Sequence, residues 1–179
     1  MQQTVKTPDS FFLNQSSSAS AALSFNMKKS IATKIAELIN ARNQLNAAYD
    51  ADRILRQSEN YIYELDGNTL VVCVEVKKVQ WYQWEICRLS VNPEHEGKGR
   101  GARMLQKAEE IAHAGNAKIV QCTIRIGVDR SERAFLKQGY LKTISFYNRK
   151  TENYVAVWQK AIRYRALSDS STARGTIDG

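Results

Sequence analysis

Residues 85–112 read EICRLSVNPEHEGKGRGARMLQKAEEIA. The stretch begins as an apolar, β-rich run that stops at Pro93, and it continues into a loop with glycines at positions 97, 99 and 101. Beyond the loop, apolar residues recur at helical spacing and form one stripe: Met104, Leu105, Ala108, Ile111 and Ala112. The stretch therefore predicts a strand, a glycine-rich loop and an amphipathic helix in direct succession.

A glycine-rich loop at the start of a helix suits a phosphate ligand. Glycines let backbone N–H groups approach a ligand without interference from a Cβ atom, and they adopt positive φ readily. The first helical turn adds N–H donors that lack intrahelical partners, at the positive end of the helix dipole. Lys98, Arg100 and Arg103 bring positive charge to the same segment. This combination favours a phosphate site over a flexible turn before an ordinary helix.

Alternating helical and β patterns extend outward from this stretch. The expected elements are a helix opened by Asn26 that runs past Arg42, a short helix over 51–57, strands over 61–65, 70–76 and 84–91, the helix ending at Gly115, a strand over 118–126, a helix from a capping box at Asp129 to Gly139, and strands over 140–147 and 154–161. Asp66-Gly67-Asn68 predicts a hairpin turn between the first two strands. This order predicts an α/β (α+β) domain built on a mixed sheet.

The two ends of the chain differ from its middle. Residues 1–25 are rich in Ser, Gln and Ala with little periodicity, and residues 163–179 are polar. We expect an extension, a domain over 26–162 and a tail, since 179 residues suit one core. No apolar run approaches the roughly 20 residues of a membrane span. The start shows no secretory signal, so we expect a cytoplasmic protein.

Composition narrows the ligand classes only in part. The net charge of +8 suits a nucleotide cofactor, a nucleic acid or an acidic partner. No nucleic-acid-binding signature accompanies the charge, so a nucleic-acid-binding module ranks last. The three cysteines form no C-x-x-C pair and there are only two histidines, so we expect neither a disulfide frame nor a metal site.

The loop Glu96-Gly97-Lys98-Gly99-Arg100-Gly101 is neither a Walker loop nor a dinucleotide G-x-G-x-x-G. It resembles the acetyl-CoA loop of the GNAT (Gcn5-related N-acetyltransferase) superfamily, whose pattern is Gln/Arg-x-x-Gly-x-Gly/Ala. The lead-in over 89–94 and the helix end over 134–140 are similar to the family as well, and the resemblance covers about residues 27–161. It implies a mostly antiparallel central sheet with helices on both faces.

The resemblance also implies an activity, which is transfer of an acetyl group from acetyl-CoA to an amine by direct attack, without a metal. Backbone amides of the glycine loop would hold the pyrophosphate, and main-chain groups of two strand residues would pair with the pantetheine arm. The expected cofactor-binding residues are Leu89, Val91, Glu96, Gly97, Lys98, Gly99, Arg100, Gly101, Ala102 and Phe135.

Glu85 is the predicted catalytic base. It lies eleven residues before Glu96, the offset at which histone-acetylating members of the family carry their base. Apolar neighbours on a central strand would desolvate it, which suits a base that works near neutrality. The alternative is a structural carboxylate paired with Arg88 or a lysine, or one that points into solvent. Tyr140 is the predicted proton donor to the leaving thiolate, with Tyr147 or water as alternatives.

Two residues depart from the family pattern. Glu96 stands where Gln or Arg is usual and either caps the following helix or weakens binding of the cofactor. Phe135 stands where many members have a tyrosine. These departures and the polar ends support a second hypothesis, a catalytically weak or silent GNAT-fold subunit of a larger assembly such as a bacteriophage particle, with tails that bind protein partners.

The acceptor amine stays open among a small molecule, a protein and a nucleobase, and no membrane partner is expected. Trp81, Tyr82 and Trp84 are expected beside the acceptor end, where they would stack on a flat substrate or simply pack in a hairpin.

Overall fold

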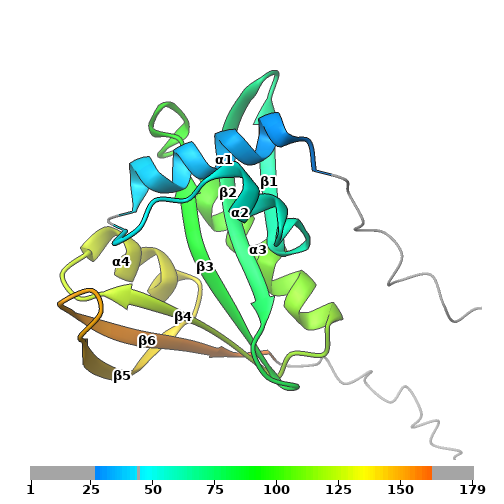
Figure 1. The fold of residues 1–179 in the computed structure, drawn as a ribbon. Coiled ribbons are helices and arrows are strands. Elements are labelled where there is room, and N and C mark those ends of the chain that lie inside the picture. The colour runs from blue at the N-terminus through cyan, green and yellow to red at the C-terminus, as the bar shows by residue number, and fades with distance from the viewer. Residues whose placement is uncertain (1–26, 44, 163–179) are drawn as a thin grey trace, which may run out of the picture.

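The computed structural model describes residues 27–43 and 45–162. The expected extension and tail, and the cap predicted at Asn26, lie outside these residues. The elements in chain order are α1 (Lys29–Arg42), α2 (Ala51–Leu55), η1 (Ser58–Asn60), β1 (Tyr61–Asp66), β2 (Thr69–Lys78), β3 (Gln83–Val91), η2 (Pro93–His95), α3 (Arg100–Ala114), β4 (Ile119–Arg125), α4 (Asp129–Lys137), β5 (Leu141–Asn148) and β6 (Asn153–Ala161) (Figure 1).

The six strands form one sheet in the order β1-β2-β3-β4-β6-β5. All neighbouring strands are antiparallel except β3 and β4, which are parallel. Helices α1 and α2 cover one face of the sheet, and α3 crosses behind it (Figure 1). The architecture confirms the predicted mixed, mostly antiparallel sheet with helices on both faces.

Strands β3 and β4 pair over a short distance only. Their register joins Gln83 to Ile119, Trp84 to Val120 and Glu85 to Gln121, and the pairing stops there. Beyond Glu85 the two strands diverge into a V that is open toward α4 (Figure 1). The middle of the sheet is therefore split.

Each face of the sheet has its own apolar core. The predicted stripe of α3 is buried except for the partly buried Ile111, with Met104 at 0% and Leu105 at 1% exposure, and it packs with β2 and α4. On the other face, Ile35 and Ile39 of α1 pack with Ile54 of α2. Burial of one such side chain stabilises the fold by about 1.5–3 kcal/mol. The helical periodicity read from the sequence thus corresponds to real packing faces.

Helix α4 begins differently from the prediction. Asp129 is its first helical residue rather than its cap, Val128 occupies the cap position, and no side chain caps the helix. The Glu132 carboxylate instead accepts a hydrogen bond from the backbone N–H of Gly127 at 3.3 Å. The predicted capping box is therefore absent, although the helix does begin at Asp129. Among the described residues, none of the helices combines the length and apolar content needed to cross a membrane.

Gly115 ends α3 where the sequence predicts, and its position tests the packing of the split sheet. A Cβ atom at Gly115 would lie 2.1 Å from Cζ2 of Trp84, while its φ of −79° is open to any residue. We expect Gly115→Ala to lower the free energy of unfolding by about 1–3 kcal/mol through overpacking. Urea unfolding followed by circular dichroism measures this change.

Gly101→Ala is the matched control. The added Cβ atom would meet Cγ2 of Val91 at 3.4 Å, an ordinary contact, inside the first turn of α3. This variant should unfold at the wild-type urea concentration or above it, because alanine favours a helix over glycine. Equal midpoints for the two variants would contradict the packing of Trp84 against α3.

Candidate active site

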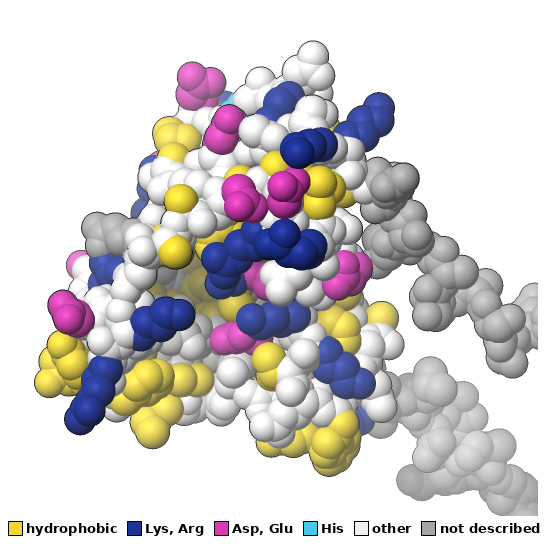
Figure 2. Space-filling view, in the orientation of Figure 1, with side chains coloured by type: hydrophobic (Ala, Val, Ile, Leu, Met, Phe, Trp, Pro, Cys, Tyr) yellow, Lys and Arg dark blue, Asp and Glu magenta, His cyan; other side chains and the backbone are white. Residues whose placement is uncertain are grey.

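A cavity of about 460 Å³ lies where β3 and β4 part. It is lined by residues from the end of α1, from β3, from β4 and from α4, and Glu85, Leu89 and Phe135 of the predicted site are among them. Figure 2 shows this face of the molecule hollowed, with hydrophobic side chains on the floor of the hollow and Lys and Arg side chains beside it. The split sheet thus creates a cavity whose lining combines apolar side chains with polar ones, including Arg42, Arg88 and Arg125.

The edge of β3 that faces β4 has no partner strand between Ile86 and Val91 in the described structure. On the opposite edge, Arg88 and Leu89 together stand opposite the single residue Val74 of β2, which is a β-bulge. Arg88 has a φ of +53°, uncommon for a residue with a side chain. Main-chain groups of β3 are therefore available to a ligand that enters the cavity as an added strand.

An ion pair anchors the bulge from the α1 side. The Glu75 carboxylate on β2 is 2% exposed and accepts a hydrogen bond from the Arg88 guanidinium. That guanidinium lies 4.8 Å from the ring centroid of Tyr49, and the guanidinium of Arg53 lies 3.7 Å from the same ring. A buried carboxylate needs such a partner, since leaving it unpaired costs several kcal/mol. Glu75 therefore holds Arg88 in its strained backbone conformation.

The glycine loop has the shape of an anion cradle. Gly97 and Gly99 have φ of +72° and +71°, and a Cβ atom at Gly97 would meet nothing within 4 Å. Gly99 occupies the cap position of α3, and within residues 27–43 and 45–162 no side chain caps the start of that helix. Free N–H donors at a helix start fit a phosphate group. The loop residues present therefore fit the pyrophosphate of a CoA molecule.

The three cations of the loop are placed differently. Nζ of Lys98 donates to the carbonyl oxygen of Glu94 at 3.2 Å, and Nη1 of Arg103 donates to that of Lys98 at 3.4 Å. Both side chains stay at the loop with their charge uncompensated by these carbonyl groups. Arg100 instead pairs with Glu64 on β1 at 3.4 Å, so its charge is partly neutralised.

Glu96 makes two ion pairs that the sequence analysis missed. Its Oε1 lies 2.5 Å from Nη2 of Arg42, the last residue of α1, and its Oε2 lies 2.7 Å from Nη1 of Arg130 on α4. The hydrogen bond from Arg130 and the attraction of Arg42 outweigh burial and hold the pKa of Glu96 below its ordinary value. Glu96 does not cap α3, so the capping alternative was wrong.

Glu85 lies on the wall of the cavity at the point where β3 and β4 part. Its carboxylate is 20% exposed and forms an ion pair with Nζ of Lys77 at 3.2 Å. Burial lowers the pKa of Lys77, but Cys87, Glu85 and Glu75 outweigh burial and hold that pKa above its ordinary value. Lys77 therefore stays charged near neutrality, and the pairing with a lysine weighed from the sequence is present at this position.

These features are those of a known group of enzymes. The model of the acetyltransferase (GNAT) family matches residues 31–140. The chain belongs to the GNAT acetyltransferase family. Membership makes acetyl transfer its activity and acetyl-CoA its co-substrate. A search of the curated proteins finds no match.

Solved structures share the fold of this GNAT domain at low sequence identity. A putative acetyltransferase, yncA from Salmonella typhimurium, solved with its cofactor acetyl-CoA, matches with a TM-score of 0.65 at 17% identity, covering 81% of this chain and 96% of its own. The ribosomal-protein-alanine N-acetyltransferase from Brucella melitensis matches with 0.66 at 12% identity, covering 76% and 98%. Rv2747 from Mycobacterium tuberculosis, in complex with CoA and NLQ, matches with 0.65 at 10% identity, covering 77% and 98%.

Two aromatic residues of the GNAT domain contact each other near the cavity. Phe135 lines the cavity and packs edge-on against Tyr140, with ring centroids 5.0 Å apart. Tyr140 is fully buried and is not among the cavity-lining residues. Burial and then the charge of Glu109 raise the pKa of its hydroxyl far above the ordinary value. A hydroxyl with a raised pKa is a weaker proton donor. The role of Tyr140 as proton donor to the leaving thiolate stays a prediction.

The aromatic trio does not gather as one platform at the open end of the V. Trp81 is 73% exposed and stacks edge-on with Tyr82 at 4.9 Å between β2 and β3. Trp84 packs against the core beneath α3. Trp81 and Tyr82 thus pack within the β2–β3 hairpin, which is the alternative weighed from the sequence, and stacking of the trio on a flat acceptor stays a prediction.

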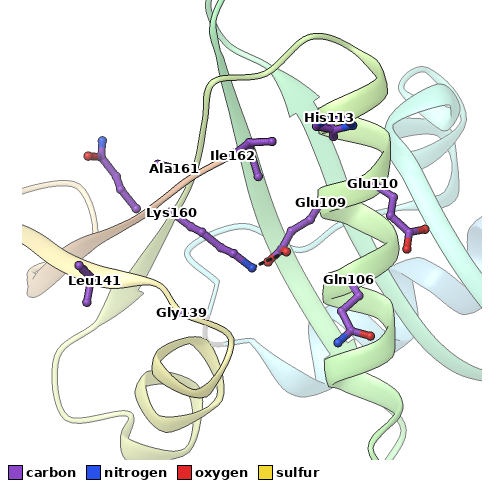
Figure 3. Close-up of a pocket in the computed structure, with 10 residues that line it drawn as sticks. Gln106, Glu109, Glu110, His113, Gly139, Leu141, Lys160, Ala161 and Ile162 are labelled. Carbon is purple, nitrogen blue, oxygen red and sulfur yellow. Dashed lines mark hydrogen bonds and ion pairs between the residues drawn. The ribbon is translucent and has the colours of Figure 1, made fainter. Parts of the chain in front are cut away.

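A second hollow, of about 740 Å³, lies between α3 and the strands β5 and β6. Its rim carries Glu109, Glu110 and His113 of α3, and Glu109 forms an ion pair with Lys160 at 2.6 Å (Figure 3). None of the predicted site residues lines this hollow, whereas Glu85, Leu89 and Phe135 line the smaller cavity. An acidic rim disfavours an anionic donor, so we assign the chemistry to the smaller cavity between β3 and β4.

The cradle can be tested at Gly99. Gly99→Glu places a charged side chain on a residue with left-handed backbone at the start of α3, so we expect affinity for acetyl-CoA to fall by at least about a hundredfold. Calorimetric titration measures the change. Gly139→Glu is the control, because Gly139 has the same backbone type (φ +84°) outside the cavity. Equal loss of affinity in both variants would mean that backbone strain, not the cradle, governs binding.

Proposed function

We propose that this chain transfers the acetyl group of acetyl-CoA to the nitrogen of an amine by direct attack, inside the cavity between β3 and β4. The observation that carries this proposal is the partnerless edge of β3, which forms one wall of the cavity, bears the Glu85 carboxylate and leads along the chain toward the glycine loop. That loop is tied to the cavity by the ion pair between Glu96 and Arg42, because Arg42 lines the cavity. A donor with phosphates, an amide-bearing arm and a thioester matches this sequence of surfaces.

The donor is held mainly by backbone groups in this proposal. Amides from Gly97 to Gly101 bind the pyrophosphate, and the free edge of β3 around Leu89 and Val91 pairs with the amides of the pantetheine arm. Phe135, at 7% exposure, packs against the arm from the α4 side. Backbone recognition of this kind needs no particular side chains, which suits a loop that departs from the usual pattern.

The transfer step moves one proton and exchanges one bond. The amine nitrogen attacks the thioester carbonyl carbon, the new C–N bond forms, and the C–S bond breaks to release the CoA thiolate. Glu85 accepts the proton that the nitrogen loses. The ammonium group of Lys77, 3.2 Å from the Glu85 carboxylate, holds that carboxylate in place on the cavity wall.

Glu85→Gln tests this assignment. The amide keeps the size of the side chain but cannot take a proton, so we expect turnover to fall by about 10²–10³-fold while affinity for acetyl-CoA is unchanged. Steady-state kinetics with a panel of amines, together with calorimetry, separates the two effects. Glu110→Gln, an exposed carboxylate on α3, is the charge-matched control and should keep full turnover. Wild-type turnover in Glu85→Gln would remove Glu85 from the mechanism.

A cysteine-bound acetyl intermediate is the chemical alternative to direct attack, since Cys87 and Cys122 both line the cavity. Burial raises the pKa of Cys87 to about 12, and burial also raises that of Cys122. The thiolate is the nucleophilic form, so both side chains are poor nucleophiles near neutrality. This favours direct attack by the acceptor.

Replacement of both thiols distinguishes the two routes. We expect the Cys87→Ala and Cys122→Ala variants to retain turnover within about threefold, because neither thiol is in its nucleophilic form. Mass spectrometry of the wild-type protein after incubation with acetyl-CoA alone should show no added acetyl group. A stable acetyl adduct on either cysteine would favour a two-step route.

The acceptor amine and the role of the chain ends stay predictions. The neighbour from Brucella melitensis is a ribosomal-protein-alanine N-acetyltransferase. A protein N-terminus is therefore one reasonable candidate for the amine panel. The hypothesis of a silent subunit in a larger assembly rested partly on residues 1–25 and 163–179, which lie outside the described residues.

A further inference from the structure

We propose that Arg42 and Arg130 are phosphate ligands of acetyl-CoA, and that Glu96 holds both arginines at the mouth of the cavity until the phosphates replace it. This inference rests on the proposed function and adds two residues to the donor site. It also gives Glu96, which departs from the family pattern, a defined role. We call the three side chains the Glu96 latch.

The latch joins three separate parts of the fold beside the phosphate cradle. Glu96 directly precedes Gly97, Arg42 is the last residue of α1, and Arg130 lies in the first turn of α4. Arg42 also lines the cavity between β3 and β4. Each arginine pairs with a different oxygen of the same carboxylate, at 2.5 and 2.7 Å. A phosphate bound at the neighbouring amides would therefore come close to both guanidinium groups.

The strengths of the competing interactions favour exchange. Arg130 is 61% exposed, so water and salt weaken its pair with Glu96, and exposed pairs of this kind contribute little to stability. A pyrophosphate carries more charge than one carboxylate and offers several oxygens in a geometry that guanidinium groups bind in a bidentate manner. Phosphate should therefore displace Glu96 from the arginines.

The carboxylate of Glu96 also explains why phosphate binding at the cradle needs the two arginines. An unpaired carboxylate next to the cradle would repel the phosphates that the amides attract. Arg42 and Arg130 could remove this repulsion in two ways. They could stay on Glu96 and only neutralise it, or they could turn to the phosphates as ligands. The two cases differ in what Arg130 does once Glu96 has no charge.

A double-substitution experiment separates the two cases by calorimetric titration with acetyl-CoA. We expect Glu96→Gln to bind acetyl-CoA about threefold more tightly, because the competing carboxylate is gone. We expect Arg130→Gln to weaken binding about tenfold, and we expect a loss of about tenfold to persist when Arg130→Gln is added to Glu96→Gln. Arg42→Gln should repeat the pattern from the α1 side.

Arg133→Gln is the matched control, since it removes the same charge from an exposed position further along α4. Its affinity should stay within about twofold of the wild type, because Arg133 is neither a partner of Glu96 nor a residue that lines the cavity. Thermal unfolding of every variant should stay close to that of the wild type, because the replaced side chains are on the surface or at its edge.

Three results overturn the inference. If Arg130→Gln has no effect in the Glu96→Gln background, the arginine only neutralises Glu96. If Glu96→Gln weakens binding, the carboxylate supports the cradle rather than competing with phosphate. If the wild-type chain binds no acetyl-CoA, the proposed function fails, and this inference fails with it for a different reason.

Discussion

The separation of β3 from β4 after three paired residues is the constraint on which the site depends. Parallel strands normally continue side by side, and here their divergence leaves one edge of β3 without a partner and opens a cavity between β3 and β4. The same divergence places Glu85 at the last paired position, so the carboxylate lies at the boundary between closed sheet and open cavity. In the proposed reaction, donor, acceptor and Glu85 meet at this boundary, and it is the interruption of the sheet that gives them room.

Charge pairs support the interrupted sheet on the α1 side. Glu75 holds Arg88 at the bulge, and Lys77, two residues further along β2, holds Glu85. Such pairs gain little net stability, since desolvation of the ions offsets much of their attraction. Their value here is positional. They fix the backbone of a strand that lacks ladder hydrogen bonds on its other edge, at the place where the ligand must be aligned.

Local signals in the sequence were sufficient for the elements that surround the site. The glycine spacing, the stop at Pro93 and the apolar stripe of α3 lie within one continuous stretch, so the strand, cradle and helix could be predicted together. Contacts between distant segments could not. Arg42 and Arg130 lie 54 and 34 residues from Glu96, and no local pattern marks them as partners. Burial of Tyr140 behind Phe135 depends likewise on how α4 docks, so a hydroxyl that looked available in the sequence faces the core.

The substitution of Glu96 for the usual Gln or Arg illustrates how a motif can change while its electrostatics persist. Two guanidinium groups and one carboxylate leave one net positive charge beside the cradle, the same charge that a single arginine at this position would supply. Helices α1 and α4 thus provide what the loop itself lacks. The presence of Glu96 therefore argues for a different arrangement of charged side chains at the phosphate site rather than for loss of the site. A loop that served only as a turn would not need two arginine partners for its carboxylate.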